Sequence, residues 1–177
     1  MTMARTWTDL SLIEQPERIA RLARDVRGYP IPFVVEFDDQ GIPDFRALDM
    51  KKWVHAVNTK RCGICGQPLG GRMAFVGGPL SMANRLFTDL PMHRTCAEYA
   101  LRVCPFIAAP KFAYSPKVEG VRVATSVSDT RPERFGLGIS RGFSVAQLPS
   151  GDIVLHANPF EEITWWREGR QEGEPEK

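Results

Sequence analysis

The segment Cys62-Gly-Ile-Cys-Gly66, followed later in the chain by His93-Arg-Thr-Cys96, decides the fold. Each of these two segments holds two metal-binding side chains that are separated by two residues. The interleaved glycines of the first segment let the backbone curl until both sulfur atoms face one point. Thiolate and imidazole groups in a set of four select zinc in tetrahedral geometry. We therefore predict one zinc ion held by Cys62, Cys65, His93 and Cys96.

The second pair of ligands lies where a helix over residues 95–103 is predicted to begin. Residues three apart at a helix N-terminus share one face, and the positive end of the helix dipole favours a thiolate there. Four protein ligands close the coordination shell, whereas a catalytic zinc ion usually keeps one position open for water. The sequence therefore predicts a structural zinc ion.

Cys104 is the one other cysteine of the chain and a competing ligand. On the predicted helix it lies roughly 12 Å from Cys96, which is too far for both to bind one ion. We expect Cys104 to be a buried structural thiol. Two alternatives stay open at this point. The candidate ligands could be unrelated core side chains, or Cys104 could replace His93 in the metal shell.

The order of a zinc knuckle, a β-hairpin and a ligand pair at a helix start resembles the treble-clef zinc finger over residues 60–104. The resemblance implies a hairpin within residues 72–90, with strands over 72–76 and 84–88. Treble clefs serve nucleic-acid binding, protein docking and nuclease catalysis, so the resemblance alone does not name a function. A nuclease of this type needs a general-base histidine on the hairpin. Residues 72–90 contain no histidine, which argues against that activity.

Hydrophobic periodicity outside this unit predicts an α+β protein with an N-terminal helix and a C-terminal antiparallel sheet. Residues 16–26 have apolar side chains at helical spacing, and Asp49 is a candidate N-cap for a helix that runs to about Asn58. Residues 160–167 fit either a strand or a short helix. The other expected strands cover residues 31–37, 43–46, 118–125, 136–140, 143–147 and 153–157.

The chain length suits a single domain, which we divide into four parts. An N-terminal helix and strand segment covers residues 11–59, and the zinc-binding unit covers residues 60–104. A β-rich segment follows over residues 117–167. The charged tail over residues 168–177 is predicted to be disordered.

Composition limits the classes of function. No apolar run approaches the roughly 20 residues that span a bilayer, and the N-terminus lacks the apolar region of a signal peptide. We therefore expect a cytoplasmic protein without membrane contact, in which the four cysteines stay reduced. The formal net charge of +2 excludes a strongly polyanion-binding molecule as a whole.

Basic residues nevertheless gather in the zinc-binding part, where residues 61–120 hold seven Lys/Arg and three Asp/Glu. If the arginines share a face, a non-catalytic zinc protein could contact nucleic acid through them. The alternatives are a solvated surface, or a zinc-stabilised protein-interaction module, an adaptor or inhibitor, with Trp165 or Trp166 as a contact. Zinc-dependent hydrolysis is the third hypothesis. The candidate contact residues are Arg61, Arg72, Arg85, Arg94 and Arg102.

Overall fold

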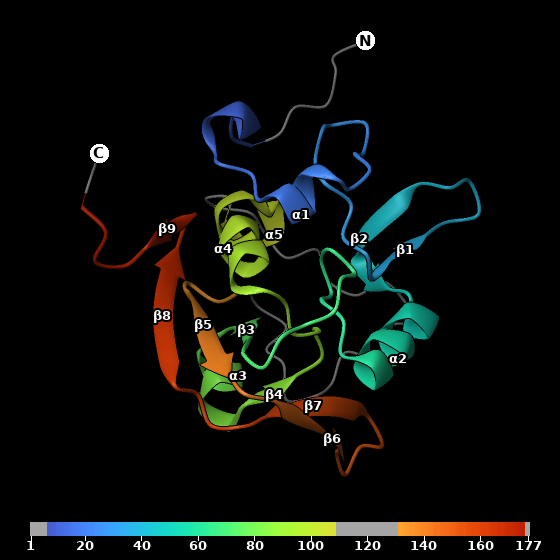
Figure 1. Cartoon of the computed structure of the whole chain (residues 1–177), viewed down its shortest axis with the longest axis vertical. Coiled ribbons are helices and arrows are strands. Elements are labelled where there is room, and N and C mark those ends of the chain that lie inside the picture. The colour runs from blue at the N-terminus through green and yellow to red at the C-terminus, as the bar shows by residue number, and fades with distance from the viewer. Residues whose placement is uncertain (1–6, 109–130, 176–177) are drawn as a thin grey trace.

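A computed structural model describes residues 7–108 and 131–175 of the chain (Figure 1). It confirms an α+β fold, and its strands form three antiparallel sheets with the orders β1-β2, β3-β5-β8-β9 and β4-β7-β6. The helices are η1 (Leu10–Leu12), α1 (Glu17–Ala20), α2 (Met50–Thr59), α3 (Pro79–Asn84), α4 (Arg94–Val103) and α5 (Pro105–Ala108). The strands are β1 (Val35–Phe37), β2 (Pro43–Leu48), β3 (Met73–Gly77), β4 (Leu86–Phe87), β5 (Phe135–Ser140), β6 (Phe143–Gln147), β7 (Ile153–Ala157), β8 (Glu162–Arg167) and β9 (Arg170–Gln171).

The helix predicted over residues 16–26 is one turn long, because α1 ends at Ala20 and the chain then turns back on itself. The Asp25 carboxylate accepts the backbone N–H of Tyr29 at 3.0 Å, and Gly28 takes a left-handed φ of 101°. Asp and Gly favour such a turn over a continued helix. Val26, predicted to lie on the buried face, is 94% exposed.

The next segment follows its predicted pattern. β1 and β2 form an antiparallel hairpin, and the Asp49 carboxylate caps α2 by accepting the backbone N–H groups of Lys51 and Lys52. This cap satisfies helix donors that otherwise have no partner. Trp53 is buried as predicted, whereas Val54 is 48% exposed. The buried stripe of α2 is therefore narrower than its apolar spacing indicates.

β3 lies between the two hydrophobic cores of the molecule. Ala74 and Val76 belong to the core under α4, whereas Met73 and Phe75 belong to the core that contains Met82 of α3. All four of these β3 residues are buried. A strand covered on both faces needs apolar side chains at every position, which explains the unbroken run Met-Ala-Phe-Val.

The hairpin expected over residues 72–90 is not formed. α3 separates β3 from β4, and each strand pairs with a C-terminal partner: Phe75 lies opposite Gly138, and Phe87 lies opposite Leu155. Pro79 at the start of α3 favours a helix there, since its missing N–H is not needed in a first turn. The chain returns to β3 only through an isolated bridge to Met92. A treble-clef arrangement is therefore not shown.

The strands predicted over residues 136–140, 143–147 and 153–157 are confirmed as β5, β6 and β7. They do not make a separate C-terminal sheet, because β5 pairs with β3 and β7 pairs with β4. Residues 160–167 contain the strand β8. The strand predicted over residues 118–125 lies outside the described residues.

The described part of the tail, residues 168–175, contains the short strand β9. Glu168 and Gly169, with φ of 47° and 78°, form a tight turn that folds β9 onto β8. Further along, the Glu174 carboxylate accepts a hydrogen bond from Arg102 of α4 at 3.0 Å.

Phe160 packs over a glycine in the middle of β5. A Cβ atom at Gly138 would lie 2.5 Å from ring carbons of Phe160, which is too close for unstrained contact. The Phe160 ring also neighbours Phe75 and Phe87, with centroid distances of 6.4 and 6.2 Å. Gly138 therefore provides the space that lets this aromatic cluster close over the sheet.

Gly138→Ala should lower the free energy of unfolding by about 1–3 kcal/mol, because the added methyl group forces the Phe160 ring out of its packed position. Chemical denaturation of the variant measures this change. Gly70→Ala is the matched control, since a Cβ there meets no atom within 4 Å. Equal stabilities of the two variants would contradict the packing argument.

Candidate metal centre

The loop after α2 presents Cys62 and Cys65. α2 ends where Lys60 takes a left-handed φ of 51°, which turns the chain away from the helix axis. The Cys62 N–H then donates to the Gln67 carbonyl, and the Gly66 N–H donates to the Cys62 carbonyl, both at 2.9 Å. Gly66 has a φ of 72°, as the tight curl of this loop requires. The backbone therefore closes into the predicted knuckle.

The second ligand pair stands at the start of α4. His93 is the N-cap residue of this helix and Cys96 lies in its first turn. Met92 exchanges two backbone hydrogen bonds with Ala74 of β3, at 2.8 and 2.9 Å, and the Gly63 N–H donates to the Pro91 carbonyl at 3.1 Å. These bonds tie the start of α4 both to β3 and to the knuckle, which brings the two pairs together.

The four ligand atoms of Cys62, Cys65, His93 and Cys96 all lie within 4.8 Å of one another. His93 Nδ1 is 3.4 Å from Cys65 Sγ and 4.0 Å from Cys96 Sγ. A tetrahedral zinc ion with Zn–S bonds of about 2.3 Å separates its sulfur ligands by about 3.8 Å, so the spacing fits. The sulfur-rich donor set also matches the chemistry of zinc. This Cys3His group could hold a metal ion such as zinc.

The group is closed off from solvent on its cysteine side. Cys62 and Cys96 have no exposed surface, and Cys65 is 8% exposed. His93 is half-buried and lies at the outer side of the group. A ligand set of four with buried sulfur atoms leaves little room for a water or substrate position, which is typical of structural zinc sites.

The Pro68 carbonyl orients the His93 imidazole. His93 Nε2 lies 3.0 Å from this oxygen, and a carbonyl only accepts, so Nε2 carries the proton. In the neutral imidazole the lone pair is then on Nδ1, which faces the sulfur atoms of Cys65 and Cys96. Metal-binding histidines commonly have their second ring nitrogen held in this way.

The three clustered thiols shift one another's pKa values. Hydrogen bonds from Cys62 and Cys96 hold the pKa of Cys65 far below its ordinary value. Hydrogen bonds with Cys62 and Cys65, together with burial, raise the pKa of Cys96. In the metal-free protein one thiolate is therefore favoured and further ionisation is opposed. A bound cation would remove that opposition, because each thiolate would then face positive charge.

Cys104 does not belong to this group, as predicted. It is the C-cap residue of α4, at the end of the helix opposite to Cys96. Burial raises the pKa of the Cys104 thiol to about 11. Such a thiol stays protonated and is a poor metal ligand and nucleophile.

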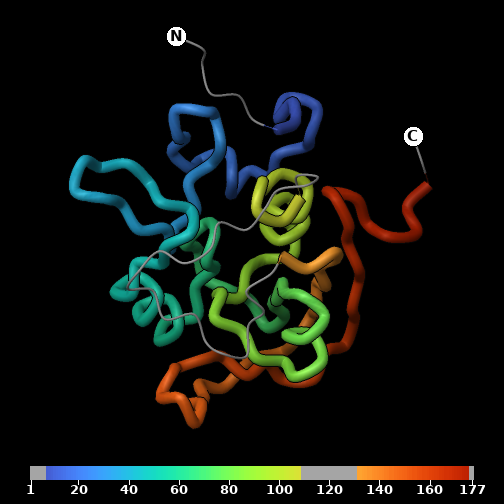
Figure 2. Tube along the Cα trace, turned by 180° about the vertical axis from the view of Figure 1, so that it is seen from behind, coloured from blue at the N-terminus to red at the C-terminus, as the bar shows by residue number. Residues whose placement is uncertain are grey.

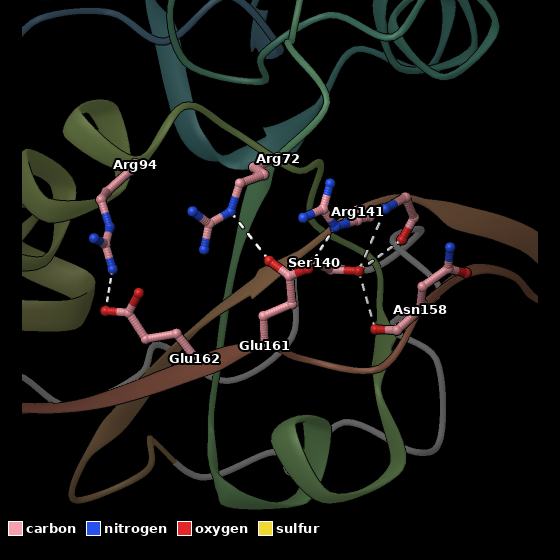
Figure 3. A network of polar contacts seen from close by, with 8 residues as sticks. Arg72, Arg94, Ser140, Arg141, Asn158, Glu161 and Glu162 are labelled. Carbon is pink, nitrogen blue, oxygen red and sulfur yellow. Dashed lines mark hydrogen bonds and ion pairs between the residues drawn. The ribbon is translucent and has the colours of Figure 1, made fainter.

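The arginines predicted to form a basic face each bind a partner within the chain. Arg72 pairs with Glu161 at 3.1 Å, and Arg94 pairs with Glu162 at the start of β8 (Figure 3). Glu161 also accepts a hydrogen bond from Arg141, which lowers the pKa of this glutamate. Arg94 also lies 3.7 Å from the Glu98 carboxylate. The three arginines and three glutamates are neutral in sum, and the Arg72 and Arg94 pairs join β3 and α4 to β8.

The other three arginines are likewise held. Arg61 donates to the Gly66 carbonyl at 3.0 Å, and Arg85 donates to the Ala157 carbonyl at 3.1 Å. Arg102 stacks over the Trp166 ring at 4.8 Å and pairs with Glu174. Each of the five side chains thus has a partner within the chain, and Arg72 and Arg94 line one surface cavity together with Met73 and Ile139.

Three features of the site and its surroundings were not predicted from the sequence. The sequence gives no indication that the Pro68 carbonyl contacts His93, because every residue carries a backbone carbonyl. Ser140 is fully buried, and its hydroxyl lies 2.9 and 3.0 Å from the carbonyls of Gly142 and Asn158, beside the arginine–glutamate network (Figure 3). The adjacent pair Glu161-Glu162 could have been noticed as a partner for basic residues, but its position depends on long-range strand pairing.

Comparison with known proteins identifies no relative of this chain. No family model, no curated protein and no solved structure matches it. No helix in the two described ranges has the length and apolar character needed to cross a bilayer.

Cys62→Ser should abolish stoichiometric zinc and markedly lower the melting temperature, because three ligands hold zinc weakly and the buried cluster loses its cross-link. Cys104→Ser should keep one zinc ion per chain and cost only about 1 kcal/mol of stability. Elemental analysis and thermal melts of both variants check this. Equal loss of metal in the two variants would place Cys104 in the metal shell.

Proposed function

We propose that this chain is a non-catalytic protein in which one zinc ion, bound by Cys62, Cys65, His93 and Cys96, has a structural role. The observation that supports the proposal is the convergence of four ligand atoms within 4.8 Å, with the cysteines buried. The ion would connect the knuckle to the first turn of α4. It would thereby stabilise a part of the chain that has short elements and many loop hydrogen bonds.

The positions of the histidines argue against catalysis at this ion. The chain has three histidines, and His93 belongs to the ligand group itself. His55 is exposed on α2, and His156 lies in β7 opposite Leu86 and Ser144. Neither lies in the ligand group, so neither is placed to act as a general base on a zinc-bound water.

Chelation should unfold the zinc-binding part of the chain. Excess chelator is expected to remove the ion, lower the far-UV helical signal and lower the melting temperature, and added zinc should restore all three. The free cysteines fit a reducing, cytoplasmic environment, so the measurement is made with reductant present. Full removal of zinc with unchanged helicity and melting temperature would show that the ion is not structural.

A protein-interaction module is the second candidate function. The β1–β2 hairpin projects from the body of the molecule (Figures 1 and 2). Phe37 and Ile42 on this hairpin, and Met50 on the following helix, are 44%, 56% and 57% exposed. Exposed apolar side chains on a projecting element favour contact with another protein. Contact with nucleic acid through the five predicted arginines has less support, because each of them already has a partner within the chain.

Binding assays with DNA and RNA of arbitrary sequence distinguish a protein-interaction module from a nucleic-acid-binding protein. If the five predicted arginines form a nucleic-acid surface, Arg72→Ala and Arg94→Ala should each weaken salt-sensitive binding. We expect no effect from either variant, because both side chains are neutralised by glutamates. Fluorescence anisotropy with labelled oligonucleotides at several salt concentrations measures this, and a clear loss in both variants would restore the original nucleic-acid hypothesis.

A further inference from the structure

A surface cavity of about 640 Å³ lies where the N-terminal segment, the end of α4 and the β8–β9 turn meet. Its volume is in the range of small-molecule sites. It lies at the opposite end of α4 from the metal ligands. Its lining includes Trp7, Ile13, Arg102, Arg167, Glu168 and Arg170.

The β8–β9 turn concentrates positive charge at this cavity. The two-residue turn makes Arg167 and Arg170 direct cross-strand neighbours. Like charges opposite each other destabilise a strand pair unless an anion lies close to both. The turn also requires a left-handed φ of 47° at Glu168, which is uncommon for a residue with a long side chain. This turn therefore places two arginines side by side in the lining of the cavity.

The arginines of the cavity differ in how firmly they are held. Arg102 is paired with Glu174 at 3.0 Å, whereas the partners of Arg167 among the described residues are the more distant Glu133 and Glu172, at 3.8 and 3.7 Å. Within the described residues, the exposed Arg170 makes no ion pair. The cavity therefore offers one unpaired guanidinium group and one weakly paired group. The tail glutamates act as internal carboxylate partners that an incoming anion would replace.

Trp7 adds an aromatic wall to the cavity. Its indole N–H donates to the Val103 carbonyl at 2.7 Å, and its backbone N–H donates to the Tyr29 hydroxyl at 3.0 Å. The ring is thus fixed in place, and because its polar atom is already satisfied, it offers carbon surface to the cavity. Aromatic rings beside arginines are used to stack nucleobases next to their phosphates.

We propose that this cavity binds the phosphate group of a nucleotide, either free or within a nucleic-acid strand, through Arg170 and Arg167 with Trp7 beside them. Arginine forks bind phosphate oxygens in pairs, which favours phosphate over a single carboxylate. The proposal does not depend on the metal, because none of the lining residues is a candidate ligand.

The test uses the zinc-loaded full chain with two probes, ATP by calorimetry and a labelled single-stranded oligonucleotide by anisotropy, at low salt. Arg170→Ala should weaken binding about tenfold or more, as expected for loss of charge-assisted hydrogen bonds. Arg170→Lys should restore it only in part. Glu174→Gln should tighten binding, since it frees Arg102. Arg141→Ala is the matched control, because Arg141 is an exposed arginine outside the cavity and paired with Glu161, and it should leave binding unchanged.

Binding of ATP alone would assign the cavity to free nucleotides, and binding of the oligonucleotide alone would assign it to strands. Binding of both supports the shared phosphate chemistry. The proposal is overturned if neither probe binds, or if Arg141→Ala weakens binding as much as Arg170→Ala does. Circular dichroism and zinc content of each variant show that the fold is intact, so failure here is separate from failure of the structural zinc.

Discussion

The convergence of three enclosed thiols and one half-buried imidazole at a single point is the constraint on which the rest of this structure depends. Such a group is costly to enclose without a cation, because ionised sulfur atoms repel one another and neutral ones make weak hydrogen bonds. The knuckle, the start of α4 and the edge of β3 meet at this point through short backbone bonds. The same α4 then covers one face of the central sheet, so the candidate metal centre and the first hydrophobic core share a helix.

β3 connects the metal-binding part of the chain to its C-terminal half. Its two faces contribute to different cores, and its free edge is completed by β5 from the C-terminal segment. Arg72, just before β3, and Arg94, beside His93, reach across to the glutamates at the start of β8. The ion pairs on the surface therefore connect the same two halves of the chain that the pairing of β3 with β5 connects in the interior. The arginines that composition suggested for an external partner are used to join the two halves.

Local chemistry was predictable from the sequence, and long-range pairing was not. The ligand set, the Asp49 cap of α2, and the strands β6 and β7 all depend on residues within a few positions of one another, and the structure brings each of them together as predicted. The β3–β4 hairpin was wrong, because Pro79 starts a helix and both strands find partners far along the chain. The helix over residues 16–26 was too long, because its apolar spacing did not reveal the turn stabilised by Asp25.

The pairing of β3 with β5 has a consequence for synthesis of the chain. Phe75 lies opposite Gly138, so the partner strand of β3 is translated only after the whole ligand segment. Contacts that close such large loops form late in folding. During that interval the apolar run Met-Ala-Phe-Val of β3 has one uncovered edge, while all four ligands of the cysteine–histidine group have already been translated. Early capture of zinc by the nascent chain would anchor β3 through Met92 and shorten its exposure to aggregation.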